Sequence, residues 1–167
     1  MQSALDRREG ALVNFDDAFT KLIGHEGGYV NDKRDPGGET KFGISARAYP
    51  SVDIANLTLE GAKLIYFCDY WGPAGCDVVP DVIKFDLFDM AVNSGIRPAI
   101  KMLQRTVQTT EDGILGPITL QALNSIDSVK LAIKYNANRL EFYTELSTWP
   151  AFGKGWVRRI VANLRSI

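Results

Sequence analysis

The chain has 167 residues, of which 46% are hydrophobic, and its formal net charge at pH 7 is −1. This length predicts one domain with an ordinary core, and the composition is too apolar for a disordered protein. The balanced charge gives no sign of nucleic-acid binding, and no apolar run approaches the roughly 20 residues that a membrane span requires.

The first predicted helix begins after Asn14, a favourable N-cap residue, with Asp16 and Asp17 in its first turn. Apolar residues then recur with a helical period, and Gly27-Gly28 is expected to end the helix. Glu26 is therefore expected in the last turn, beside the face that packs inward. Partial burial at such a place raises the pKa of a carboxyl group.

The segment over residues 29–44 has a different pattern, because turn-forming Asn, Asp, Pro and Gly residues dominate its middle. Tyr29-Val30 and the segment 41–44 are candidates for short strands. We expect a small, irregular β-hairpin or loop here.

The rest of the chain predicts helices. They are expected over residues 58–70, 80–95, 98–107, 128–146 and 154–164, with a further short helix that Pro117 opens. The predicted fold is mainly α with a small β insertion near residues 29–44. It forms a single domain over residues 1–167, with a catalytic half (15–95) and a second helical half (98–167).

Glu26 and Asp35 are the candidate reacting groups. Cleavage of a glycosidic bond needs a proton for the leaving oxygen and a second carboxylate that acts as base or nucleophile. Glu26, on a helix, suits the proton donor, whereas Asp35, on a polar loop, should stay ionised. Thr40 is a candidate to hold the attacking water. The alternative is that Glu26 caps a turn and Asp35 only begins one.

A series of motifs strengthens the catalytic interpretation. The motifs are Glu26-Gly27-Gly28-Tyr29, residues 35–45, Tyr70-Trp71, residues 88–95 and residues 155–159. In this order they resemble glycoside hydrolase family 108, a family of lysozyme-like N-acetylmuramidases, over residues 15–167. The resemblance implies that Glu26 is the essential acid. Phage-type lysozymes use a Glu, an Asp and a Thr in similar order, but Thr40 lies one position closer to Asp35 than that pattern has it.

Five further residues are candidates for substrate binding. Tyr29, Phe42 and Trp71 offer aromatic rings on which sugars stack, although most aromatic residues belong to a core. Asp89 and Asn93 share one helix face, which is expected either to line a sugar cleft or to face solvent.

Two C-terminal features allow a binding role. The segment 112–119 resembles the turn of helical peptidoglycan-binding modules, although Asp-Gly and Gly-Pro also encode a plain tight connection. The last helix is basic and amphipathic, so a weak contact with an anionic surface is one reading of it. The other, which we favour, is the closing helix of the core.

A metal site is not expected, because His25 is the single histidine. Cys68 and Cys76 are too few for a disulfide framework, so we expect both thiols to be reduced, and the alternative is a bridge between them in an oxidising compartment. Proton transfer and charge stabilisation suffice for glycoside hydrolysis, so no cofactor is expected.

The resemblance implies a peptidoglycan hydrolase that cleaves the β-1,4 bond between N-acetylmuramic acid and N-acetylglucosamine. Bacterial peptidoglycan is the expected partner, with neither nucleic acid nor stable membrane insertion, and we expect a monomer. The first ten residues lack the apolar centre of a secretory signal. We therefore expect a phage endolysin that is made in the host cytoplasm and released to the wall by a separate permeabilising protein. The alternatives are a lytic transglycosylase and a non-catalytic wall-binding or secretion-assisting module.

Overall fold

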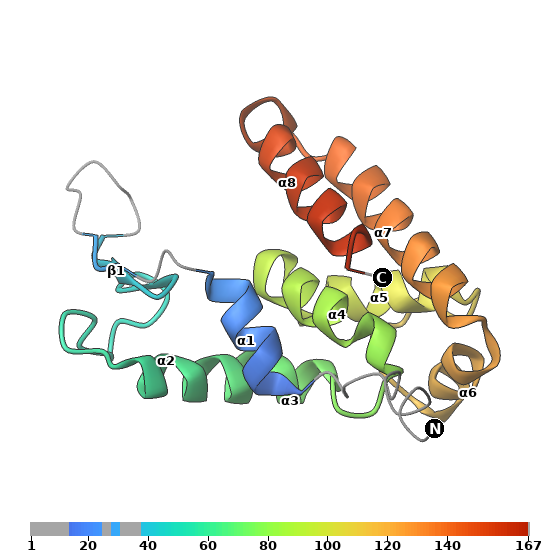
Figure 1. Ribbon diagram of the computed structural model, residues 1–167, viewed down its shortest axis with the longest axis horizontal. Helices are drawn as coiled ribbons and strands as arrows, with labels where there is room; N and C mark the ends of the chain where they lie inside the picture. Colours follow the sequence, from blue (N-terminus) through green and yellow to red (C-terminus); the bar gives the residue numbers. More distant parts are fainter. Residues whose placement is uncertain (1–13, 25–27, 31–37, 167) are drawn as a thin grey trace, which may run out of the picture.

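The computed structural model describes residues 14–24, 28–30 and 38–166, and in them the mainly α prediction is confirmed. In chain order the elements are α1 (Phe15–Ile23), β1 (Thr40–Lys41), β2 (Ile44–Ser45), α2 (Leu59–Tyr66), the π-helical turn η1 (Phe67–Trp71), α3 (Gly72–Ala74), α4 (Asp81–Ser94), α5 (Ile96–Thr106), α6 (Pro117–Ser125), α7 (Ser128–Thr144) and α8 (Trp149–Leu164). Figure 1 shows α4 in the middle of the molecule, with α1 and α2 on one side and the antiparallel pair α7 and α8 on the other.

Helix α1 begins as predicted but ends early. The Asn14 side chain caps it by accepting a hydrogen bond from the backbone N–H of Asp17 at 2.9 Å. The helix ends at Ile23, because Gly24 takes a φ of 59°, in the left-handed region that glycine adopts without strain. The prediction that the helix continues to Gly27-Gly28 is therefore wrong. Glu26 lies outside the described residues.

The predicted small β element is present as a hairpin. Strands β1 and β2 pair antiparallel, and Val30 extends the pairing through a bridge to Thr40. Phe42 and Gly43 form the turn with φ values of 52° and 76°, as a type I′ turn requires. The Tyr66 hydroxyl on α2 donates to the Phe42 carbonyl oxygen at 3.1 Å, so the hairpin is tied to the helices at its turn.

The helix that the sequence predicts after Thr58 is present, but its last part is irregular. The Thr58 hydroxyl accepts from the Gly61 N–H at 3.1 Å and caps α2. The helical chain continues through η1 and α3 until Gly75, which has a φ of 71°. Within η1, Trp71 is fully buried, and its indole N–H donates to Asp77 Oδ1 at 2.8 Å.

Helix α4 forms the centre of the core. Pro80 precedes it and Gly95 ends it, which confirms the predicted limits. Buried residues follow on most of its faces, namely Ile83, Asp86, Leu87, Phe88, Asp89, Met90 and Ala91. Two buried aspartates in such a helix need partners, because an unpaired buried charge is very costly.

The C-terminal helices also follow the predicted order. Helix α8 begins at Trp149, earlier than the predicted Lys154, because Pro150 fits the first turn of a helix. The rings of Tyr143 on α7 and Trp156 on α8 stack with centroids 4.9 Å apart, which fastens the two helices together.

The segment before α6 forms a tight connection around Gln104. The buried Gln104 amide donates to Asp112 Oδ1 at 2.6 Å and to the Ile114 carbonyl oxygen at 3.1 Å. Its oxygen accepts from the Gly113 N–H at 2.8 Å, and Gly113 has a φ of 76°. These contacts account for the residue types in the turn without any ligand.

Within the described ranges no helix is both long and apolar enough to cross a membrane. No group of three or more His, Cys, Asp or Glu residues there is arranged to hold a metal ion. Cys68 and Cys76 are not bridged; Cys68 is exposed and Cys76 is buried.

Candidate active-site pocket

A pocket of about 340 Å³ lies where the end of α1, the hairpin, α2, α4 and α8 meet. Its described lining residues are Leu22, Ile23, Phe42, Gly43, Tyr66, Val92, Asn93 and Arg159. Two of them, Leu22 and Ile23, are the last residues of α1, and Glu26 follows three positions later in the sequence, outside the described residues.

The hairpin turn gives the pocket one wall, and its shape depends on glycine. A Cβ atom on Gly43 would lie 2.6 Å from the Tyr66 hydroxyl oxygen, far inside contact distance. Burial raises the pKa of Tyr66 to about 12, so this hydroxyl remains protonated at neutral pH and keeps its bond to Phe42. An uncharged hydroxyl group therefore ties this wall to α2.

The opposite wall is polar and is organised by Asp89. The Asn93 side-chain N–H donates to the Asp89 backbone oxygen at 2.7 Å and to Asp89 Oδ1 at 3.2 Å. Arg159 Nη1 lies 2.5 Å from the same Oδ1 atom. Asp89 itself is only 1% exposed, whereas the Arg159 side chain is 40% exposed. The buried Asp89 carboxylate thus orients the side chains of two pocket residues, Asn93 and Arg159.

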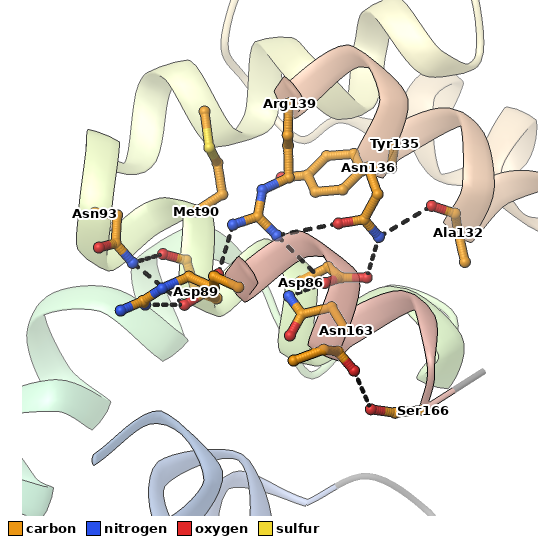
Figure 2. A network of polar contacts seen from close by, with 12 residues as sticks. Asp86, Asp89, Met90, Asn93, Ala132, Tyr135, Asn136, Arg139, Asn163 and Ser166 are labelled. Atoms are coloured by element: carbon orange, nitrogen blue, oxygen red, sulfur yellow. Dashed lines mark hydrogen bonds and ion pairs between the residues drawn. The ribbon is translucent and has the colours of Figure 1, made fainter. Parts of the chain in front are cut away.

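A buried network supports this carboxylate from behind, as Figure 2 shows. Arg139 on α7 is fully buried, and its Nη2 atom donates to Asp89 Oδ2 at 2.5 Å. Its Nη1 atom lies 3.2 Å from Asp86 Oδ1, so one guanidinium joins both acids of α4. This planar fork suits two carboxylates at fixed positions.

Asp86 completes the network on the side away from the pocket. It accepts from the amides of Asn136 at 2.8 Å and Asn163 at 2.6 Å. Burial is the main effect on this carboxyl and raises its pKa, while Arg139 opposes the shift. The α4, α7 and α8 helices are consequently tied together through one buried polar cluster.

The structure describes only part of the predicted catalytic set. Glu26 and Asp35 lie outside the described residues. The Thr40 backbone pairs with Val30, and its hydroxyl donates to the Gly38 carbonyl oxygen at 3.4 Å. The roles assigned to these three residues stay predictions.

The predicted sugar-binding residues fall into two groups. Phe42 and Asn93 line the pocket, and Tyr29 is 45% exposed beside the Val30 bridge. Trp71 and Asp89, in contrast, are buried among protein atoms. In this structure Trp71 offers no ring face to a sugar, which favours a role in the core. Asp89 is paired with Arg139 and Arg159, which favours a role in positioning other side chains.

Sequence reasoning missed two pocket residues. Arg159 belongs to a motif that supported the family resemblance, but nothing in its spacing indicated a place beside α4. Tyr66 lies inside a predicted helix and carried no signal of a polar contact with the hairpin. Both positions depend on packing between distant elements.

Comparisons with known proteins agree with this architecture. The family model described as Glycosyl hydrolase 108 matches residues 19–95, and the model described as Predicted Peptidoglycan domain matches residues 98–161. The chain is similar to the solved structure of Brucella abortus SagA, with 31% sequence identity and a TM-score of 0.81. This similarity covers 91% of this chain and 92% of that chain. No curated protein matches the chain.

Proposed function

We infer that this chain, which belongs to the glycosyl hydrolase 108 family, is an N-acetylmuramidase. The two family matches support a peptidoglycan hydrolase. The finer proposal is that it hydrolyses the β-1,4 bond between N-acetylmuramic acid and N-acetylglucosamine.

The observation that carries this proposal is the place of the pocket at the end of α1. Leu22 and Ile23 line it, and Glu26 follows Gly24 by two positions. We propose that Glu26, three positions after Ile23 in the sequence, acts in this pocket, which has one apolar and one polar wall.

In the proposed reaction Glu26 donates its proton to the glycosidic oxygen as the bond to the sugar carbon breaks. Asp35 orients or deprotonates a water molecule that attacks this carbon. Val30 and Thr40, which flank the segment of the sequence that contains Asp35, pair in a β-bridge. By analogy with phage-type lysozymes we favour inversion at the sugar carbon.

Product analysis of digested wall tests the proposal. Wild type should clear a suspension of peptidoglycan and leave hydrated reducing ends, whereas a lytic transglycosylase would leave anhydro sugars. Glu26→Gln should slow clearing by roughly 10²–10⁴-fold, which is the usual contribution of a general acid. Glu60→Gln, in the first turn of α2, is the matched control and should clear like wild type. Clearing by Glu26→Gln at the wild-type rate would refute the assignment.

The peptidoglycan-domain match favours a second candidate, a module that binds the wall without cutting it. Sedimentation with insoluble peptidoglycan separates the two. Binding by wild type and by Glu26→Gln, without clearing by either, would support the module and exclude the muramidase.

The proposed biological role is that of a phage endolysin. It rests on the sequence resemblance, and cell fractionation tests it. The protein should reach the periplasm only when a separate permeabilising protein is coexpressed; export without such a protein would contradict the role.

A further inference from the structure

The candidate pocket is shared by the two segments that match different family models. Seven of its described lining residues fall between positions 22 and 93, within the glycosyl hydrolase match, whereas Arg159 comes from α8 in the peptidoglycan-domain match. Arg159 is also the one charged residue among the described lining residues. The C-terminal segment therefore contributes directly to the candidate pocket.

Arg159 and Asn93 are neighbours with fixed orientations. Both bond to Asp89 Oδ1, Arg159 through Nη1 at 2.5 Å and Asn93 through its N–H at 3.2 Å. Asp89 cannot move to follow them, because Arg139 holds its other oxygen. Asp89 is thus a positioning residue for both side chains.

The orientation of the Asn93 amide follows from its partners. Asp89 presents two acceptors to it, a backbone oxygen at 2.7 Å and a carboxylate oxygen, so the NH₂ group must face them. The amide oxygen of Asn93 consequently points away from Asp89, as Figure 2 shows. Among the described residues this oxygen has no hydrogen-bond donor, so it remains available as an acceptor.

The charge of the cluster indicates a neutral ligand. Asp86 and Asp89 carry two negative charges, and Arg139 and Arg159 carry two positive ones, so the paired cluster has no net charge. The guanidinium of Arg159 still has several N–H donors beyond the one that faces Asp89. It therefore acts as a rigid donor rather than as an excess cation that requires an anionic partner.

One donor beside one acceptor is the complement of a secondary amide. We propose that Arg159 and Asn93 bind the N-acetyl group of the sugar in this pocket. Arg159 donates to its carbonyl oxygen, and Asn93 accepts from its N–H. The inference rests on the proposed function for the class of ligand, and it adds a binding site made jointly by both halves of the chain.

Binding of two neutral oligosaccharides tests the proposal. N-acetylchitotetraose carries N-acetyl groups, and cellotetraose has the same β-1,4 backbone with hydroxyl groups in their place. Titration calorimetry with Glu26→Gln, which is expected to slow turnover, should show a preference for N-acetylchitotetraose. Arg159→Met and Asn93→Ala should each lower this preference by roughly tenfold or more, as expected for loss of one hydrogen bond to a ligand.

Controls separate binding from folding. Arg158→Met removes the neighbouring arginine of α8, which is exposed and lies outside this pocket, and should leave the preference unchanged. Arg159→Lys keeps a cation for Asp89 but loses the planar fork, so it should fold and still lose preference. Thermal unfolding of each variant checks that it is folded at the temperature of the titration.

Three results would overturn the inference: no binding of N-acetylchitotetraose, no preference in the Glu26→Gln background, or an unchanged preference in the Arg159 and Asn93 variants. The proposed reaction is judged separately. An Arg159-dependent preference in a protein that never clears the wall would support this binding site and contradict the proposed hydrolase activity. Clearing without such a preference would support the hydrolase activity and contradict the binding site.

Discussion

Arg139 on α7 donates from Nη2 to Asp89 Oδ2 on α4 at 2.5 Å, across 50 positions of the chain. Both side chains are buried, so neither charged group is hydrated by bulk water. A buried ion pair of this kind adds little net stability compared with apolar packing. Here it sets the position of α4 against α7 and, through Asp89, the position of the polar wall of the pocket.

Loss of Arg139 should destabilise the protein strongly. Arg139→Met retains bulk but leaves Asp86 and Asp89 buried without their shared cation, so the free energy of unfolding should fall by about 3–5 kcal/mol. Urea denaturation measures the change. Arg105→Met is the control, because Arg105 pairs with Glu111 at 3.0 Å on the surface and such a pair contributes about 1 kcal/mol or less. Equal losses in the two variants would contradict the assignment.

Asp86 should make stability depend on pH. Burial raises its pKa in the folded protein above the ordinary value of 3.8, so the folded state binds this proton more tightly than the unfolded chain. Its contribution is then fully present below about pH 4 and is lost as the pH rises through the folded-state pKa. Asn does not titrate. In urea denaturation, the free energy of unfolding of Asp86→Asn should therefore rise relative to that of wild type between pH 4 and pH 7.

Asp53 supplies the control of opposite sign. Hydrogen bonds from Asn56 lower the pKa of this exposed carboxyl, so its contribution is present above about pH 4 and is lost as the pH falls. The free energy of unfolding of Asp53→Asn should therefore fall relative to that of wild type as the pH rises. A gain of wild type over Asp86→Asn with rising pH would show that the attraction of Arg139 outweighs burial.

Gly43→Ala should damage both the hairpin and the pocket. The new Cβ atom would meet the Tyr66 hydroxyl at 2.6 Å, and alanine at a φ of 76° adds backbone strain of about 1–3 kcal/mol. Thermal unfolding and wall clearing should both decline. Adding Tyr66→Phe removes the obstructing oxygen and should restore part of the stability. Gly155→Ala in α8 meets nothing within 4 Å and should instead stabilise the helix slightly.

Gln104→Leu should lower stability without a matching effect on catalysis. Three hydrogen bonds of the Gln104 side chain hold the turn at Asp112 and Gly113, and their loss should cost about 2–3 kcal/mol. Below its unfolding temperature the variant should clear wall at the wild-type rate, because Gln104 does not line the candidate pocket. Gln121→Leu, on the exposed surface of α6, is the control for stability. Slower clearing by a fully folded Gln104→Leu would instead point to wall binding by this turn.

The helices were largely predictable because their limits depend on neighbouring residues. Asn14 and Thr58 cap helices as their types suggest, and Pro80 and Gly95 bound α4. The error at α1 has a local cause as well. Gly24 and the Gly27-Gly28 pair can each end a helix, and the sequence contains no rule that chooses between them.

The sequence by itself determined a mainly α chain, a small β-hairpin or loop near residues 29–44 and the motifs that resemble a known family. Burial and partnership were decided only by the tertiary structure. Helical spacing places Asp89 and Asn93 on one face whether that face is exposed or buried. Only the packing of α7 and α8 brings Arg139 and Arg159 to the Asp89 carboxylate. Helix caps act over three or four residues, whereas these contacts join positions 50 and 70 apart. The periodicity of a helix does not indicate which residue, distant in the sequence, will contact one of its side chains.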